Sequence, residues 1–139
     1  MRDIKYLVVH CSATKEGKDF GADDFRKWHM RKGWSDVGYH FCIRLDGTIE
    51  EGRPIEKIGA GVRGYNSNSI HICYTGGVDS NIKPKDTRTP EQKEALRFKL
   101  MALKQQFPHA EILGHRDLPD VRKACPSFDA KGEYKDIWI

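Results

Sequence analysis

The sequence has no apolar run that approaches the ~20 residues required to span a bilayer, and we expect no association with a membrane. Residues 1–6 show neither an apolar secretory core nor a small-residue cleavage site. We therefore expect synthesis in the cytoplasm without a signal peptide. Because that compartment is reducing, the four scattered cysteines are expected to be thiols or metal ligands rather than two disulfides.

A concentrated basic stripe is also missing, although the net charge is +4. Lysine and arginine are spread along the chain with acids between them, whereas a nucleic-acid binder more often clusters basic residues among aromatics. The nearest such cluster, residues 26–32, fits better as the solvated face of a helix. We expect no nucleic-acid partner, and a modest positive charge also suits an anionic polymer.

Internal repeats and low-complexity segments are absent, and 139 residues is a length typical of one domain. Residues 1–139 are therefore expected to form a single domain. Period-two alternation and β-forming residues predict strands, and an Asp-Gly pair at residues 46–47 predicts a hairpin turn. The predicted strands cover residues 4–10, 39–45, 48–52, 70–74 and 111–114.

Two helices are predicted between these strands. Over residues 22–32, apolar residues recur with helical spacing and a glycine follows at the C′ position. The second helix starts after Thr89, which can cap it, because Pro90 suits the first helical position and Gln92 completes a capping box. It is expected to run to about Phe107. This order of elements indicates an α/β fold, with a central mixed β-sheet flanked by helices.

The remaining segments are polar or rich in glycine. Residues 12–21 and 78–88 are expected to be loops, and residues 57–69 are expected to form a long loop that serves as a binding surface. In the C-terminal tail we expect a short helix, for which Ser127 is a plausible cap.

Pairs of cysteine or histidine with two to four residues between the partners are missing as well. A structural zinc site usually has four ligands in such pairs, whereas a catalytic site keeps a position open for water and takes ligands from distant elements. His115 and Cys125 stand ten positions apart near the C-terminus, and His10 ends the first predicted strand. These residue types point to one catalytic zinc ion. With six histidines and four cysteines in one small domain, ordinary packing roles for these residues stay open as well.

Four motifs stand in a fixed order along the chain: WSDVGYHF at 34–41, GYNSNSI at 64–70, GHRD at 114–117 and KACPSFD at 123–129. Together they resemble the zinc-dependent N-acetylmuramoyl-L-alanine amidases of the type-2 family, and they are similar to the amidase-type lysozymes of T-odd coliphages. Peptidoglycan recognition proteins share the fold. The similarity runs from His10 to about Asp129.

The resemblance implies an α/β fold with an exposed groove that contains one zinc ion per chain. It implies hydrolysis of the amide bond between N-acetylmuramic acid and L-alanine in bacterial peptidoglycan, as carried out by phage or prophage endolysins. By position, His10, His115 and Cys125 match the family's zinc ligands. Tyr39 and Lys123 match its two further catalytic residues.

A His-Glu-x-x-His motif, which supplies the base in many zinc peptidases, is missing, so other residues must handle protons. Tyr39 could orient the attacking water or relay a proton to the leaving amine. Lys123 stands two residues before Cys125, and in an extended segment it could stabilise an oxyanion on the same side. Without the resemblance, a core tyrosine and a solvated lysine would be the simpler assignments, and the general base stays undecided.

Other residues receive supporting assignments. His40 faces away from Tyr39 and is expected to be structural or to support a metal ligand. His29 and His71 are expected to pack in the interior or lie at the surface. The candidates for glycan or peptide contacts lie in the long loop, and they are Arg63, Tyr65, Asn66 and Asn68.

Two alternatives stay open. A non-catalytic recognition module would bind peptidoglycan without cutting it, but members of that kind often lack the cysteine that this chain has at Cys125. A small zinc-stabilised structural domain would unfold on metal removal and have no lytic role. As an enzyme, the protein is expected to be a monomer that reaches the cell wall through a separate pore or another delivery system.

Overall fold

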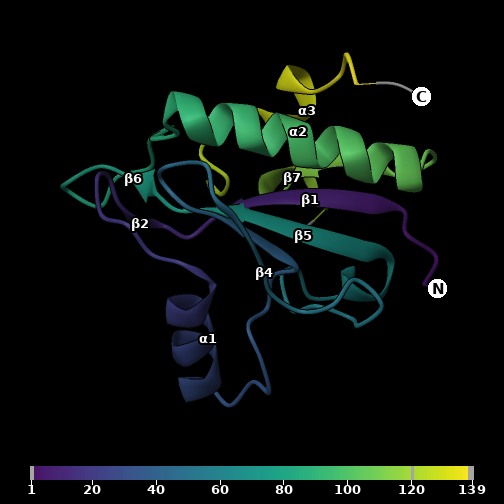
Figure 1. Cartoon of the computed structure of the whole chain (residues 1–139), viewed down its shortest axis with the longest axis horizontal. Coiled ribbons are helices and arrows are strands. Elements are labelled where there is room, and N and C mark those ends of the chain that lie inside the picture. The colour runs from purple at the N-terminus through teal and green to yellow at the C-terminus, as the bar shows by residue number, and fades with distance from the viewer. Residues whose placement is uncertain (1, 120, 138–139) are drawn as a thin grey trace.

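The computed structural model describes residues 2–119 and 121–137. Its main sheet has five strands in the order β4-β3-β5-β1-β7 (Figure 1). β4 runs antiparallel to β3, and all other neighbours are parallel. The predicted mixed sheet is therefore confirmed. Its strands are β1 (Tyr6–Cys11), β3 (Phe41–Ile43), β4 (Ile49–Glu51), β5 (Ser69–Tyr74) and β7 (Glu111–Gly114).

β1 lies between β5 and β7, and it determines where the functional side chains meet. The register pairs His10 with Cys73 of β5, and Val9 with Gly114 of β7. Because the carboxyl ends of parallel strands meet at one edge of a sheet, the residue after Gly114 emerges beside the end of β1. That residue is His115.

Helix α2 (Pro90–Gln106) packs across one face of the sheet (Figure 1). The predicted capping box is present, because Gln92 N–H donates to Thr89 Oγ1 at 3.0 Å and Thr89 N–H donates to Gln92 Oε1 at 3.0 Å. The apolar stripe of α2 is buried against alternate residues of β1 and β5, which form the main core. Residues of this contact are Leu7, Val9, Ile70, Ile72, Leu96, Leu100 and Leu103.

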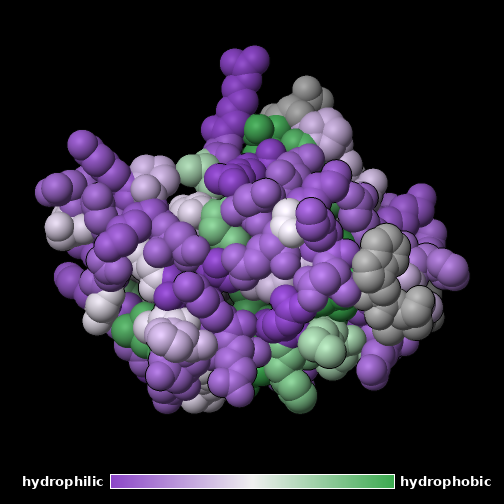
Figure 2. All heavy atoms as spheres, turned by 90° about the horizontal axis from the view of Figure 1, so that it is seen from above, coloured by the Kyte–Doolittle hydropathy of each residue, from purple (hydrophilic) through white to green (hydrophobic). Residues whose placement is uncertain are grey.

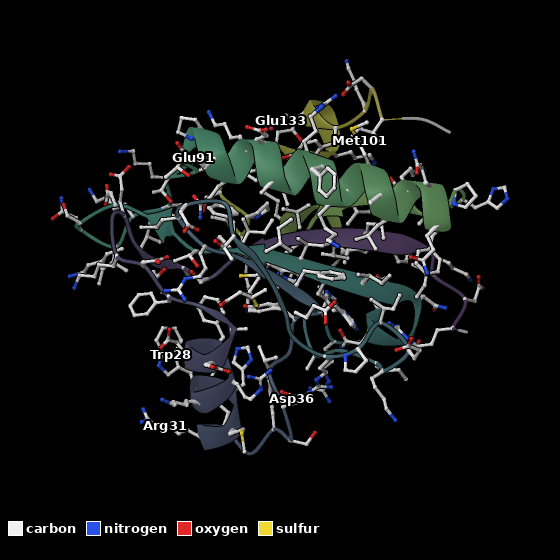
Figure 3. The ribbon with its side chains drawn as sticks, viewed as in Figure 1. Trp28, Arg31, Asp36, Glu91, Met101 and Glu133 are labelled. Atoms are coloured by element: carbon white, nitrogen blue, oxygen red, sulfur yellow. The ribbon has the colours of Figure 1, made fainter. Side chains whose placement is uncertain are left out.

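Helix α1 (Ala22–Arg31) lies on the opposite side of the sheet (Figure 1). Phe25 is buried on its inner side, whereas Arg31 is exposed near its end, where Figure 3 labels it. Gly33 follows with φ of +92°, the left-handed conformation expected of a C′ glycine. The basic residues of this segment therefore lie mostly on a solvated helix face, as the sequence predicts.

A second, two-stranded sheet was not predicted. β2 (Thr14–Lys15) pairs in parallel with β6 (Gly77–Val78), although both segments were expected to belong to loops. The strand predicted over residues 39–45 is also shorter, because β3 covers only residues 41–43. Short parallel pairs depend on a neighbour that is remote in sequence, so local patterns did not reveal them.

The C-terminal helix is α3 (Ala130–Glu133). Its cap is Asp129, whose Oδ1 accepts a hydrogen bond from Gly132 N–H at 3.1 Å, so the prediction of Ser127 as the cap was wrong. Arg88 anchors this helix to the segment before α2 through an ion pair with Glu133 at 2.7 Å. Glu133 is labelled on α3 in Figure 3.

The face that carries α2 is mostly hydrophilic, with separate hydrophobic patches (Figure 2). Phe98 and Met101 of α2 are among the exposed large apolar side chains. Within residues 2–119 and 121–137, no helix combines the length and apolar content needed to cross a membrane.

Candidate metal centre and groove

Three metal-ligand side chains converge at the carboxyl end of β1. His10 belongs to β1, His115 opens the short 3-10 helix that follows β7, and Cys125 lies in the C-terminal loop. One candidate ligand atom from each residue lies within 4.8 Å of the other two. The ring centroids of His10 and His115 are also 4.8 Å apart. The three residues that the sequence singled out are thus brought together in space.

The loop that carries Cys125 is held on both sides of this residue. Arg116 N–H donates to the backbone oxygen of Cys125 at 2.9 Å, and the Tyr74 hydroxyl donates to the backbone oxygen of Pro126 at 2.6 Å. A Cβ on Gly114 would lie 2.7 Å from Pro126 Cδ, so only glycine leaves room for this packing. The loop is therefore fixed against the ends of β5 and β7.

The donor set fits a zinc ion. Zn²⁺ binds histidine nitrogen at ~2.0–2.1 Å and thiolate sulfur at ~2.3 Å, so two ligand atoms on one tetrahedral ion lie roughly 3.3–3.7 Å apart. Cys125 Sγ lies 3.9 Å from His10 Nδ1, which is within a small side-chain adjustment of that separation. Three protein ligands leave one coordination position open, as in catalytic rather than structural zinc sites.

The surroundings favour the protonation states that bind metal. Burial lowers the pKa of His115 to about 4, with a further contribution from Lys123, and burial holds the pKa of His10 well below its usual value. Both imidazoles are therefore neutral near pH 7. The neighbouring Cys11 thiol and burial raise the pKa of Cys125, so a bound cation is needed to deprotonate it. Cys11 N–H donates to Cys125 Sγ at 3.3 Å and favours the thiolate.

Tyr39 lies beside this centre, with its ring centroid 5.4 Å from that of His10. Burial, together with nearby thiols such as Cys73, raises the pKa of Tyr39 well above its usual value. The phenol is therefore protonated and can donate a hydrogen bond. His29 Nδ1 accepts from Gly38 N–H at 2.8 Å, which fixes the backbone just before Tyr39. His29 is buried, in agreement with a packing role.

A groove of about 590 Å³ extends from the candidate metal centre along the long loop at residues 57–69. His115 and Lys123 both line it, so the predicted catalytic lysine opens onto the same groove as a candidate metal ligand. Arg63 and Tyr65, two of the four residues predicted to contact substrate, also form its walls.

The other two predicted contact residues have a different position. Asn66 Oδ1 accepts hydrogen bonds from the backbone N–H groups of Gly61 at 3.0 Å and Val62 at 2.9 Å. Asn68 Nδ2 donates to the backbone oxygen of Asp3 at 2.8 Å. Neither asparagine is among the described residues that line the groove. Asparagine is common both in turns and in binding loops, so the sequence alone did not separate these roles.

His71 is a residue of the site that the sequence did not reveal. It is completely buried in β5, and its Nδ1 lies 2.8 Å from His10 Nε2. Its own Nε2 lies 2.9 Å from Asn66 Oδ1. The alternation along β5 was an available signal, since it separates His71 from the apolar residues that face α2. The pairing of β5 with β1, which brings His71 to His10, is not visible in a local pattern.

His40 supports His71 through the backbone. His71 N–H donates to His40 Nδ1 at 3.0 Å, and His40 Nε2 donates to the backbone oxygen of Lys57 at 2.9 Å. Burial lowers the pKa of His40 to about 4, so the ring is neutral. This position agrees with the expectation that His40 is structural, because His71 lies between His40 and the candidate ligand His10.

The fold is shared with amidases and recognition proteins of known structure. The N-acetylmuramoyl-L-alanine amidase LysC from Clostridium intestinale URNW superposes with a TM-score of 0.79 at 25% identity, over 95% of this chain and 82% of that chain. Drosophila PGRP-LB superposes with a TM-score of 0.77 at 25% identity, over 98% of this chain and 82% of that chain. The predicted fold class is confirmed.

Sequence comparison defines the family. A protein-family model described as N-acetylmuramoyl-L-alanine amidase matches residues 1–128. The endolysin of Klebsiella phage KP32 is 47% identical over 130 residues, which cover 94% of this chain and 85% of that protein. The endolysin of Escherichia phage T7 is 44% identical over 125 residues, which cover 90% of this chain and 82% of that protein. The chain belongs to the N-acetylmuramoyl-L-alanine amidase family and is an enzyme of that class.

Proposed function

We propose that this chain is a zinc-dependent amidase of the endolysin type, which hydrolyses the bond between N-acetylmuramic acid and L-alanine in bacterial peptidoglycan. The observation that carries the proposal is the convergence of His10, His115 and Cys125, of which His115 also lines a groove. Family membership supports the reaction, and the donor set supports one zinc ion per chain.

When bound, zinc supplies a Lewis acid and lowers the pKa of a water molecule in its open coordination position. Two neutral imidazoles and one thiolate would hold it, so the protein contributes one negative charge to the site. Tyr39 keeps its proton because burial raises its pKa. Its phenol is therefore suited to orient the attacking water and to donate a hydrogen bond towards the leaving amine.

Lys123 brings a positive charge to the same groove. Its side chain is exposed, and its charge contributes to the low pKa of His115. During amide hydrolysis a negative charge develops on the carbonyl oxygen, and a fixed cation beside it lowers the barrier. We therefore assign oxyanion stabilisation to Lys123 and proton handling to Tyr39.

The rest of the groove suits a muramyl peptide. Arg63 and Arg122 are exposed cations on its walls, and they attract a stem peptide that carries carboxylates. Tyr65 packs edge-on against Tyr6, with ring centroids 6.0 Å apart, and offers an aromatic wall held in place by that contact. We assign Arg63 and Tyr65 to substrate binding, and make no such assignment for Asn66 and Asn68.

The test is digestion of purified peptidoglycan with and without a chelator, followed by mass spectrometry of the products. We expect free stem peptides that begin with L-alanine beside intact glycan strands, and only in metal-replete samples. Cleaved glycan strands would show that the protein hydrolyses a bond other than the proposed amide. Equal release of stem peptides after verified removal of all metal would contradict the role of zinc.

The recognition-module alternative receives some support from the fold shared with PGRP-LB. It predicts retention on insoluble peptidoglycan without any soluble product. Cys125 and Tyr39 both lie beside His10, and Lys123 lines the same groove as His115, which favours the enzyme. We further propose that residues 1–139 act as one domain and as a monomer, and that the protein reaches the wall after release through a separate pore or delivery system.

A further inference from the structure

A chain of side-chain contacts leads from the long loop to the candidate metal centre. Asn66 Oδ1 lies 2.9 Å from His71 Nε2, and His71 Nδ1 lies 2.8 Å from His10 Nε2. The other ring nitrogen of His10, Nδ1, faces Cys125 Sγ at 3.9 Å. The two contacts that connect Asn66, His71 and His10 have hydrogen-bond lengths, so the proton positions on these side chains depend on one another.

The first link has a defined direction. Asn66 Oδ1 also accepts from the backbone N–H groups of Gly61 and Val62. A backbone N–H is always a donor, so the atom that faces both of them is the amide oxygen and not the amide nitrogen. His71 Nε2, which contacts the same oxygen, must therefore carry a proton.

The second link follows from the first. His71 is completely buried, and its ring nitrogens face a histidine and an amide, so no carboxylate compensates a charge on this ring. A neutral imidazole has one N–H, and because His71 carries it on Nε2, its Nδ1 is an acceptor. His10 Nε2 must then donate, which leaves the lone pair of His10 Nδ1 directed towards Cys125.

We propose that His71, itself oriented by Asn66, is a positioning residue that holds His10 in the Nε2–H tautomer with Nδ1 free for the metal. The proposal rests on the proposed metal role of His10. A buried acceptor behind a metal-bound histidine fixes both its tautomer and its ring orientation, and losing it typically costs 10–100-fold in metal affinity.

The loop is built to admit the ring of His71. A Cβ on Gly61 would lie 2.4 Å from His71 Nδ1, and a Cβ on Gly59 would lie 2.9 Å from His71 Cδ2. Both glycines therefore provide space at the ring that contacts His10. Because Gly61 also donates its N–H to Asn66, the same turn orients the asparagine and accommodates the histidine.

The tautomer can be observed directly in the full-length, zinc-free protein. Long-range proton–nitrogen correlation NMR on ¹⁵N-labelled protein distinguishes Nδ1–H from Nε2–H in each histidine. We expect His10 and His71 both to carry their proton on Nε2. A proton on Nδ1 of His10 in the wild-type protein would overturn the proposal. This measurement depends on neither zinc nor activity.

Two variants of nearly equal size test the effect on the metal. In His71→Asn the side-chain oxygen can replace Nδ1 as the acceptor, whereas His71→Leu has no acceptor. Zinc affinity is measured by competition with a chromogenic chelator. We expect a loss of about 10–100-fold in His71→Leu and a clearly smaller loss in His71→Asn. Equal affinities in the two variants would contradict the positioning role.

His29→Leu is the matched control. His29 is also a buried histidine whose Nδ1 accepts a backbone hydrogen bond, but that bond comes from Gly38 and not from a candidate metal ligand. We expect it to lower stability without changing zinc affinity. If His71→Leu does not fold without zinc, the tautomers measured in the wild-type protein decide whether the positioning role holds. If the wild-type protein has the expected tautomers but binds no zinc, the metal proposal fails and the hydrogen-bond assignment stands.

Discussion

The Tyr74 hydroxyl donates a 2.6 Å hydrogen bond to the backbone oxygen of Pro126, one residue after the candidate ligand Cys125. Tyr74 is completely buried in the core beneath α2, whereas Cys125 is partly exposed beside the groove. This buried contact, which crosses 52 positions of sequence, therefore connects the main core with the loop of the candidate metal centre.

Tyr74→Phe tests this connection. The substitution leaves the buried Pro126 oxygen without its donor, which we expect to lower the free energy of unfolding by about 1–3 kcal/mol. Urea unfolding of the zinc-free protein measures the change, and zinc titration should show weaker binding because the Cys125 loop is less restrained. Tyr6→Phe, at a half-buried tyrosine of β1, is the control. Equal behaviour of the two variants would argue that the hydroxyl contributes nothing.

Gly61→Ala should damage the site through a clash with His71. The new Cβ would lie 2.4 Å from His71 Nδ1, so the ring must shift from its position against His10. We expect weaker zinc binding together with lower stability. Gly64→Ala is the control, because Gly64 has φ of +90° with open space around its Cβ position, and alanine there adds about 1 kcal/mol of backbone strain without a clash. Unchanged zinc affinity in Gly61→Ala would contradict the prediction.

Lys123→Ala and Tyr39→Phe should separate catalysis from metal binding. Losing one donor to a developing oxyanion costs roughly 10²–10³-fold in kcat, and losing a proton-handling group costs a similar factor. We expect both variants to retain zinc with wild-type affinity, measured by metal analysis, while release of stem peptides falls by about these factors. Lys135→Ala removes the same charge away from the groove and should keep full activity. Near wild-type activity of either site variant would remove that residue from the mechanism.

The stability of the zinc-free protein should fall as the pH drops below neutrality. Burial gives His40 a folded-state pKa of about 4, below the value of about 6.5 in the unfolded chain. Between these values the unfolded state binds more protons, so stability is complete above pH 6.5 and is lost towards pH 4. From pH 7 to pH 5, His40 alone should account for about 2 kcal/mol. The free energy of unfolding is measured in urea at pH 7 and at pH 5. In His40→Asn the difference between the two values should be smaller by that amount, and an unchanged difference would contradict the role of His40.

Sequence patterns that span only a few residues predicted local structure correctly at a helix start and at a hairpin turn. The hydrogen bonds of the capping box at Thr89 join residues three positions apart, and the hairpin turn at Gly47 needs only the left-handed conformation of one glycine, with φ of +88°. The four ordered motifs identified the family, and three of them carry residues that line one groove, namely Tyr65, His115 and Lys123. The C-terminal cap was assigned to the wrong residue, since Ser127 and Asp129 are equally suitable in type and only their positions distinguish them.

Residue types, local spacing and motif order in the sequence were sufficient to predict the fold class and the family, and they singled out the three candidate metal ligands. Tertiary structure alone decided that His71 lies behind His10, and that Asn66 serves the loop and His71 rather than the groove wall. The contact between His71 and His10 follows from the pairing of β1 with β5, and it joins residues 61 positions apart. Strand pairing of that range depends on how the whole core packs around both faces of the sheet, and no local pattern records it.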